Sequence, residues 1–289
     1  MIKSKNYLLA ALLFCCFLDY SYAQEFVLQS FKDTRVISTH SVETLPARKL
    51  DVRISHRFGD FAGDRGGWPN FYGLETAADV LIGADYGISD NLTVGLNRTK
   101  GVGIFSRLIN GSVKYRLLRQ VRGKNPISLA IVGEMSVTTL PRSSNPNSLL
   151  VFENFAHRFL YSSQVIIASV IGKKITLQLS PGIIHRNIVE DLDVNTFFNL
   201  GIQGKFQFNK GFAFIFDTTF IFRDTEELAA DFFIPLGFGF EFDTGGHVFQ
   251  VNLTNSSALA STDFIPNTNS DWLDGEFRLG FTISRLFNL

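Results

Sequence analysis

Cysteine is almost absent from this chain of 289 residues, which contains only Cys15 and Cys16. Two adjacent thiols near the N-terminus give neither a disulfide framework nor a cysteine-based zinc site. Positive charge is not in excess either, because 27 Lys and Arg residues balance 27 Asp and Glu residues. A nucleic-acid-binding protein would be expected to carry a basic patch, so that class is not indicated. Beyond residue 23, no apolar run reaches the about 20 residues that a membrane-spanning helix requires.

The first 23 residues have the pattern of a secretory signal peptide. Lys3 and Lys5 precede an apolar stretch over residues 7–18, and the small residues Ser21 and Ala23 stand two apart before the expected cleavage point. Both cysteines lie inside this leader. We therefore expect an exported mature chain that begins at Gln24 and carries no thiol, which suits an oxidising periplasm.

Phenylalanine, in contrast, is abundant, with 30 residues, and much of it recurs at every second position. Such a period of two is typical of β-strands, whose successive side chains point to opposite faces. Polar residues such as Lys205, Asp217 and Glu241 occupy the other parity. An aromatic face toward lipid and a polar face toward a lumen together predict a transmembrane β-barrel. The alternating runs comprise Phe206, Phe208, Phe212, Phe214, Phe216, Phe220 and Phe222, then Phe232, Ile234, Leu236, Phe238, Phe240 and Phe242.

The fold class predicted is all-β, an antiparallel up-and-down transmembrane barrel of about twelve strands preceded by a short N-terminal periplasmic segment, residues 24–48. The barrel itself is expected over residues 49–289. The predicted strands are 50–58, 78–86, 92–99, 109–118, 127–138, 159–171, 175–185, 197–208, 212–222, 232–242, 248–254 and 276–287. Counts of ten or fourteen strands remain open.

Loop lengths provide an independent test of this assignment. Connections after the even-numbered strands are short, as at 87–91 and 172–174, whereas those after the odd-numbered strands are mostly long, as at 139–158 and 255–275. Outer-membrane barrels show this alternation, with the short turns on the periplasmic side. The pattern predicts localisation in the bacterial outer membrane, with lipid and the barrel assembly machinery as partners.

Several phrases within residues 31–98 carry a family resemblance. They are TRVI (34–37), HSVETLP (40–46), DVRISHRFGD (51–60), NFYGL (70–74), DVLIG (79–83) and YGISDNLTVG (86–95). Together they resemble the outer-membrane β-barrel family of Bacteroidota known as domain of unknown function 5777. The resemblance implies a barrel fold and an outer-membrane location in a Gram-negative cell. It implies no activity and no catalytic residues.

Charged residues of the inward parity are the candidate lumen residues. Both signs are interleaved, which leaves two interpretations open: ion pairs that rigidify a narrow barrel, or a hydrated pore whose charges guide a small solute. These residues are Asp51, Arg53, Arg57, Asp79, Asp85, Lys114, Arg116, Glu134, Lys205, Asp217, Glu241, Glu276 and Arg278.

Two other regions are candidate binding elements. Aromatic residues in the long outer loops, namely Trp68, Phe71, Tyr72 and Trp272, are suited to stacking on a ligand or to folding over the rim. Residues 24–48 precede the first strand at the periplasmic mouth, where they form a plug, a docking tail or a loose extension.

Motifs for catalysis, metals or cofactors are lacking. No His-Glu-x-x-His and no glycine-rich phosphate loop occurs, and His40 and Glu43 stand three apart, a common spacing. An outer-membrane lipid hydrolase needs a serine activated by histidine, yet Ser55 and His56 point to opposite faces of their strand. The function predicted is a narrow pore or a small-solute binding or transport barrel. The alternative is a non-conducting structural or docking barrel for a periplasmic protein, and a lipid-active enzyme is a more distant third.

Overall fold

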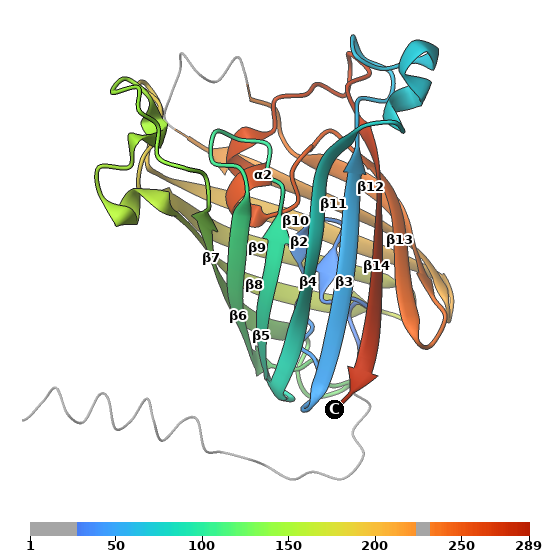
Figure 1. Ribbon diagram of the computed structural model, residues 1–289. Helices are drawn as coiled ribbons and strands as arrows, with labels where there is room; N and C mark the ends of the chain where they lie inside the picture. The colour runs from blue at the N-terminus through green and yellow to red at the C-terminus, as the bar shows by residue number, and fades with distance from the viewer. Residues whose placement is uncertain (1–27, 224–231) are drawn as a thin grey trace, which may run out of the picture.

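Twelve long antiparallel strands close into a single barrel in the computed structural model, which describes residues 28–223 and 232–289 (Figure 1). The predicted leader, residues 1–23, lies outside the described residues. None of the helices within the described ranges is long and apolar enough to cross a membrane. The strands of the barrel are β3 Lys49–Phe58, β4 Ala77–Ser89, β5 Leu92–Thr99, β6 Leu108–Leu118, β7 Ser128–Thr138, β8 Phe159–Ile171, β9 Ile175–Arg186, β10 Thr196–Asn209, β11 Phe212–Phe222, β12 Leu236–Asp243, β13 His247–Thr254 and β14 Arg278–Asn288.

Each strand pairs with its neighbours in sequence, and β14 pairs with β3 to close the barrel. Residue parity divides the wall as predicted. In β3, Asp51, Arg53 and Arg57 are buried toward the lumen, whereas Ile54 on the other face is exposed. Aromatic side chains on the outer face contact one another across strands, as in the stack of Phe212 on Phe242 with 4.9 Å between ring centroids. The predicted fold class is confirmed.

The two rims of the barrel differ in the length of their connections. Short turns follow β4, β8, β10 and β12, and a somewhat longer one follows β6; the long loops are all at the opposite rim (Figure 1). Because short turns face the periplasm in outer-membrane barrels, we call their rim the periplasmic rim and the other the outer rim. The C-terminus and the start of β3 both lie at the periplasmic rim.

Two strands begin two or more residues later than the sequence pattern predicts. The strand expected from Phe232 starts at Leu236, because Pro235 has no N–H to donate to a ladder. The last strand starts at Arg278 instead of Glu276, since Gly275, at a φ of 77°, turns the chain just before it. In each case, alternating apolar residues begin before the first hydrogen bonds of the strand. Alternation alone therefore overestimates the length of the strand.

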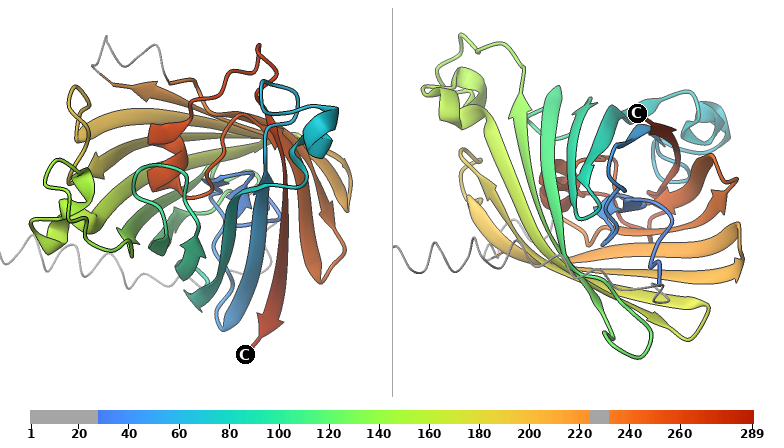
Figure 2. Two further views of the ribbon diagram at one scale, coloured as in Figure 1. Left: turned by 45° about the horizontal axis from the view of Figure 1, so that its top comes forward. Right: turned by 90° about the horizontal axis from the view of Figure 1, so that it is seen from below.

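An N-terminal stretch runs inside the barrel instead of beneath it. We call residues 28–48 the lumen segment; Figure 2, viewed from below, shows it enclosed by the strands. It contains a small hairpin of β1 Arg35–Val36 and β2 Thr39–His40, with Ile37 at a φ of 54° in the turn. Every residue from 33 to 42 is buried.

The long loop between β13 and β14 enters the barrel from the opposite rim. We call residues 255–268 the inward loop; it includes the short helix α2 Ser261–Asn267 and is buried from 255 to 266 (Figures 1 and 2). Phe264 and Ile265 pack with Ile184 and Phe197 of the wall in an apolar cluster. The sequence pattern does not predict this inward course.

Gly204 in β10 allows a close cross-strand contact on the outer face, which gives a first prediction. A Cβ atom at Gly204 would lie 2.1 Å from Cε1 of Phe216, its directly opposed partner in β11. We expect Gly204→Ala to lower the free energy of unfolding by about 1–3 kcal/mol, because the ring must leave its place. Urea unfolding in lipid vesicles measures this loss. The matched control is Gly111→Ala, where nothing lies within 4 Å of the new methyl group; equal losses would contradict the prediction.

Candidate functional site in the lumen and at its mouths

The carboxylate of Glu134, in β7, joins the two segments that fold into the barrel. Its Oε2 accepts a hydrogen bond from Nε2 of His40 at 3.2 Å and lies 3.4 Å from Nη2 of Arg35, both in the lumen segment. Its Oε1 accepts a hydrogen bond at 3.1 Å from the backbone N–H of Ser261 in the inward loop. Glu134 therefore binds both the lumen segment, which enters at the periplasmic rim, and the inward loop, which enters at the outer rim.

Asp217, in β11, anchors the turn of the lumen hairpin. Its Oδ2 accepts hydrogen bonds from the backbone N–H groups of Ser38 and Thr39, at 3.1 and 3.0 Å. Its Oδ1 accepts from the hydroxyl of Thr39 at 2.8 Å and from Nε2 of Gln203 at 3.0 Å. Four donors on one buried carboxylate compensate its charge without a cation in contact, which fixes the hairpin at mid-barrel height.

Buried wall cations bind the backbone and carboxylates of the lumen segment. Lys114 Nζ donates to the carbonyl oxygens of Thr34 and Ser41, each at 2.9 Å, and to that of Glu43 at 3.1 Å. Arg53 pairs with Asp33 through both Nη atoms. Both wall cations thereby find partners on the enclosed segment.

Other predicted lumen charges follow the same rule. Arg57 donates to Ser38 Oγ at 2.8 Å, Arg116 Nη1 pairs with Glu43 at 3.3 Å, and Lys205 Nζ lies 5.5 Å from the ring centre of Phe31. The remaining contacts are weaker or indirect: Asp85 accepts from Thr34 Oγ1 at 3.3 Å, Asp51 pairs with Arg53 at 2.9 Å, and Glu241 accepts from Gln250, whose side chain also bonds the backbone of Arg35 and Ile37.

Three predicted lumen charges belong to the outer mouth. Asp79, at the start of β4, accepts hydrogen bonds from the backbone N–H groups of Gly101 and Leu259, at 3.0 and 2.9 Å. Arg278 donates to the carbonyl of Asn255 at 3.1 Å and to Ser270 Oγ at 2.9 Å. Glu276 lies in the loop before β14, where it accepts from the N–H of Asp271. These groups shape the inward loop.

Asp263, a residue that the sequence pattern does not single out, attaches the inward loop to the loop between β5 and β6. Its carboxylate accepts hydrogen bonds from the N–H groups of Val102 and Gly103, at 2.9 and 3.1 Å, and from the amide of Asn267 at 2.7 Å. Burial raises the pKa of the Asp263 carboxyl, and these hydrogen bonds oppose that rise. The Asp263 carboxylate thereby attaches α2 to the loop that contains Val102 and Gly103.

The four aromatic residues proposed for ligand stacking lie in two different environments. Trp68, Phe71 and Tyr72 form a cluster in the 3-10 helix η1 Trp68–Gly73, and Trp68 is 73% exposed. Trp272 instead stacks on Phe277 at 4.8 Å and donates from Nε1 to the carbonyl of Leu236. The first three therefore present a free aromatic face at the outer rim, and Trp272 packs against the barrel.

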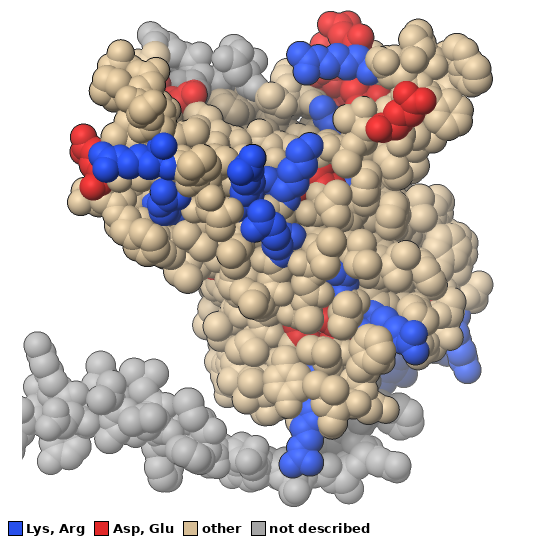
Figure 3. Space-filling model, viewed as in Figure 1, with Lys and Arg blue, Asp and Glu red and all other residues tan. Residues whose placement is uncertain are grey.

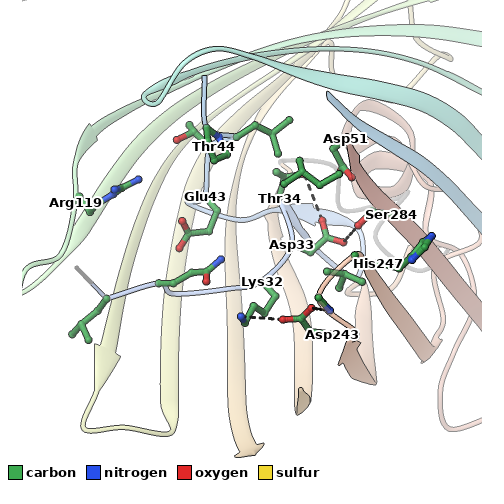
Figure 4. Close-up of a pocket in the computed structure, with 18 residues that line it drawn as sticks. Lys32, Asp33, Thr34, Glu43, Thr44, Asp51, Arg119, Asp243, His247 and Ser284 are labelled. Carbon is green, nitrogen blue, oxygen red and sulfur yellow. Dashed lines mark hydrogen bonds and ion pairs between the residues drawn. The ribbon is translucent and has the colours of Figure 1, made fainter. Parts of the chain in front are cut away.

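A cavity of about 390 Å³ opens at the periplasmic mouth, between the lumen segment and the wall (Figure 4). Side chains of both signs line it, including Glu43, Asp51, Arg119 and His247, and the ion pair of Lys32 with Asp243 crosses it at 3.0 Å. Its size and mixed charge suit a small polar solute. It is also where the lumen segment meets the periplasm.

His40 is the most strongly perturbed group of the lumen segment. Its pKa is lowered to about 3, mainly by burial and also by the positive charges of Arg35 and Lys114, against the opposing effect of Glu134. Its Nδ1 is buried without a hydrogen-bond partner among the described residues, as befits a neutral ring that donates from Nε2. Sequence reasoning set this histidine aside because its spacing to Glu43 is common, whereas its actual partner, Glu134, is 94 positions away.

The family of the chain is decided by a family model that matches residues 31–287, almost the whole barrel and lumen segment. Its description is membrane bound beta barrel domain (DUF5777). The chain belongs to this family. The membership confirms the resemblance read from residues 31–98 and extends it to the last strand. No functionally curated protein matches the chain.

Several solved barrels are similar to this chain at low sequence identity, and one of them reaches a TM-score of 0.50. The NanC porin aligns with a TM-score of 0.50 and 11% identity over 83% of this chain and all of its own. The COG4313 outer membrane channel from Pseudomonas putida F1 has a TM-score of 0.45 and 16% identity over 85% and 98% of the two chains. LpxR from Salmonella typhimurium has a TM-score of 0.39 and 11% identity over 83% and 100%. The chain is thus a membrane-bound barrel of outer-membrane type, and its predicted location is confirmed.

Removal of the Glu134 charge should loosen the lumen segment. Glu134→Gln leaves the buried Arg35 without its counter-ion, so we expect the free energy that retains the segment to fall by about 3–5 kcal/mol. Hydrogen exchange of residues 33–42 in the folded barrel measures the effect. Glu153→Gln, at an exposed loop position, is the control. Equal protection in both variants would contradict the assigned anchoring role.

Low pH should also weaken the retention of the lumen segment inside the barrel. A released segment would carry His40 at its ordinary pKa near 6.5, whereas the enclosed ring has a pKa of about 3. The released state therefore binds the additional proton between these values, and retention weakens as the pH falls through this window by up to about 1.4 kcal/mol per unit. Exchange measured against pH should flatten in His40→Asn relative to the unchanged chain. An identical pH dependence in the two proteins would exclude His40 as the cause.

Proposed function

We propose that the protein is a narrow pore for small solutes whose lumen segment acts as a removable plug. The observation that carries the proposal is the set of buried inward carboxylates and cations that bind residues 30–45 through hydrogen bonds. Wall groups of this kind have water as their alternative partner, so they suit a lumen that is hydrated when the segment leaves.

Barrel width supports the same function. A barrel of twelve strands is wider than the eight-stranded kind that its own side chains fill, and narrower than the porins of about 16–18 strands that hold an open aqueous channel. The lumen thus has space for a folded segment, or for a small solute in its place. Inward charges of both signs favour small polar or zwitterionic solutes over strongly charged ones.

The inward loop defines the second constriction in this proposal. It enters from the outer rim, where Asp79 and Asp263 hold its backbone, and meets the lumen segment at Glu134. Opening at the periplasmic side alone would leave this loop as the selective element. The lumen charges proposed from the sequence then have two roles. They bind the lumen segment while it closes the pore, and they line the pore when the segment has left.

Conductance tests the pore directly. In planar bilayers with potassium chloride, the unchanged chain should show rare openings. Asp217→Asn, which weakens the hold on Ser38 and Thr39, should increase the open fraction at least about tenfold, because charge-assisted hydrogen bonds contribute about 1.5–3 kcal/mol. Asp217→Asn combined with Asp263→Asn should increase it further. Glu153→Gln should leave it unchanged.

One outcome would reject the pore. Absence of conductance in the unchanged chain, in both Asp217 variants and in a chain lacking residues 25–48 would leave the alternative, a structural or docking barrel. In that case the cavity at the periplasmic mouth would be the place where a periplasmic protein meets the lumen segment. Heat-modifiable gel mobility establishes that each variant is folded before it is tested.

A further inference from the structure

Three cations lie together on the outward face of the barrel at the outer ends of β5 and β6. Arg98, Lys100 and Arg107 are all exposed, and Figure 3 shows Lys and Arg side chains gathered over this upper part of the wall. Arg98 shares the lipid-facing parity of Leu96 in β5, while Asn97 and Thr99 point into the lumen. We call these three residues the basic cluster.

Strand register brings the three side chains within reach of one another. Arg98 pairs with Ile109 across the β5–β6 ladder, and the N–H of Arg107 donates to the carbonyl of Lys100 at 2.6 Å just beyond its end. Lys100 therefore stands opposite Arg107, and Arg98 is the diagonal neighbour of Arg107. Opposed residues on one face have Cβ atoms about 5 Å apart, and diagonal neighbours lie within about 8 Å.

The cluster has no direct ion pair within the described part of the chain. Across residues 28–223 and 232–289, none of the three side chains is ion-paired to Asp or Glu; Lys100 Nζ donates to the carbonyl of Ala77 at 2.7 Å. Asp79, two residues further along β4, is buried in the lumen and is satisfied by backbone N–H groups. Like charges placed opposite one another destabilise a sheet, so this arrangement favours an anion supplied from outside.

Apolar residues beside and below Arg98 identify the surroundings of the cluster. Ile82 and Leu96 are 58% and 65% exposed on the outer face, and Ile109 is also exposed there. An arginine on the lipid face costs about 2–4 kcal/mol at mid-membrane but about 0–1 kcal/mol near the interface. The cluster thus stands at the upper edge of the lipid-facing band, at the height of the outer leaflet's headgroups.

The backbone under the cluster is held in place. Arg107 has a φ of 55°, unusual for a residue other than glycine, and its carbonyl accepts hydrogen bonds from the N–H and the hydroxyl of Thr139, at 3.1 and 2.8 Å. Its side chain therefore leaves the wall in a fixed direction, above β6. The cluster is positioned by the end of a ladder and does not lie on a free loop tip.

We propose that Arg98, Lys100 and Arg107 bind the phosphate groups of a phosphorylated lipid in the outer leaflet, whose acyl chains lie on the apolar wall below. Guanidinium groups bind phosphate oxygens with two parallel hydrogen bonds, and the ammonium group adds a point charge. Three uncompensated cations favour a headgroup with phosphomonoesters, which carry close to two negative charges each. A zwitterionic phospholipid brings its own cation and suits the cluster less. This site is on the outer wall and does not depend on the proposed pore.

Lipid binding to the detergent-solubilised, folded barrel tests the proposal by native mass spectrometry. Diphosphoryl lipid A is the probe, with its dephosphorylated form, phosphatidylethanolamine and inorganic phosphate for comparison. We expect the triple variant R98Q/K100Q/R107Q to bind diphosphoryl lipid A at least about tenfold more weakly than the unchanged chain. The dephosphorylated lipid should bind both proteins equally weakly, and added salt should weaken only the phosphate-dependent binding.

A charge-matched control lies at the opposite rim. K173Q/K174Q/R285Q removes three exposed cations near the periplasmic ends of β8, β9 and β14 and should leave the affinity within about twofold. Lys100→Arg, which retains the charge, should retain binding. Undiminished binding by the triple variant with its fold intact would overturn the proposal, as would equal binding of dephosphorylated lipid. Full competition by inorganic phosphate at the lipid's own affinity would indicate a site for the free anion instead.

Discussion

Buried polar groups on the inner wall impose the constraint on which the rest of this structure depends. A twelve-stranded barrel encloses more space than its own side chains fill, and a buried carboxylate or guanidinium without a partner costs several kcal/mol. The lumen segment supplies those partners mostly through its backbone: Asp217 accepts from two N–H groups, and Lys114 donates to three carbonyl oxygens. Wall charges and the enclosed segment therefore stabilise each other, and neither is satisfied alone.

Glu134 extends this dependence from one mouth to the other. Its two oxygens bind different elements, with Arg35 and His40 on one side and the backbone of Ser261 on the other. Release of the lumen segment would leave this carboxylate with a single protein partner and would change its hydration. Residues that share a partner in this way do not act additively, so events at the periplasmic mouth are coupled energetically to the inward loop.

Residue parity and loop length were sufficient to predict the wall, because both depend only on local sequence. The face of Asp51 or Leu96 follows from its position in an alternating strand, and the even strand count is compatible with the antiparallel pairing of β14 with β3 that closes the barrel. What occupies the lumen did not follow, because it depends on contacts such as His40 with Glu134, 94 positions apart, and Ser261 with Glu134, 127 positions apart. Alternation also missed the start of β12, where Pro235 ends a ladder that the pattern of phenylalanines continues.

The kind of contact that each enclosed element makes indicates which of them is removable. Helix α2 packs Phe264 and Ile265 against apolar residues of the wall. Exposure of these side chains to water would be unfavourable, because water offers no interaction that replaces apolar burial. The lumen segment also makes apolar contacts with the wall, with Phe31 and Ile37 on Ile215 and Val42 among wall residues, but its charged and polar partners add many hydrogen bonds. Water replaces most of the energy of such bonds, so their net contribution is about 1–3 kcal/mol each, the higher values applying where one partner is charged. In the pore that we propose, this difference favours a fixed constriction at the outer side and a gate at the periplasmic side, where the chain enters the barrel.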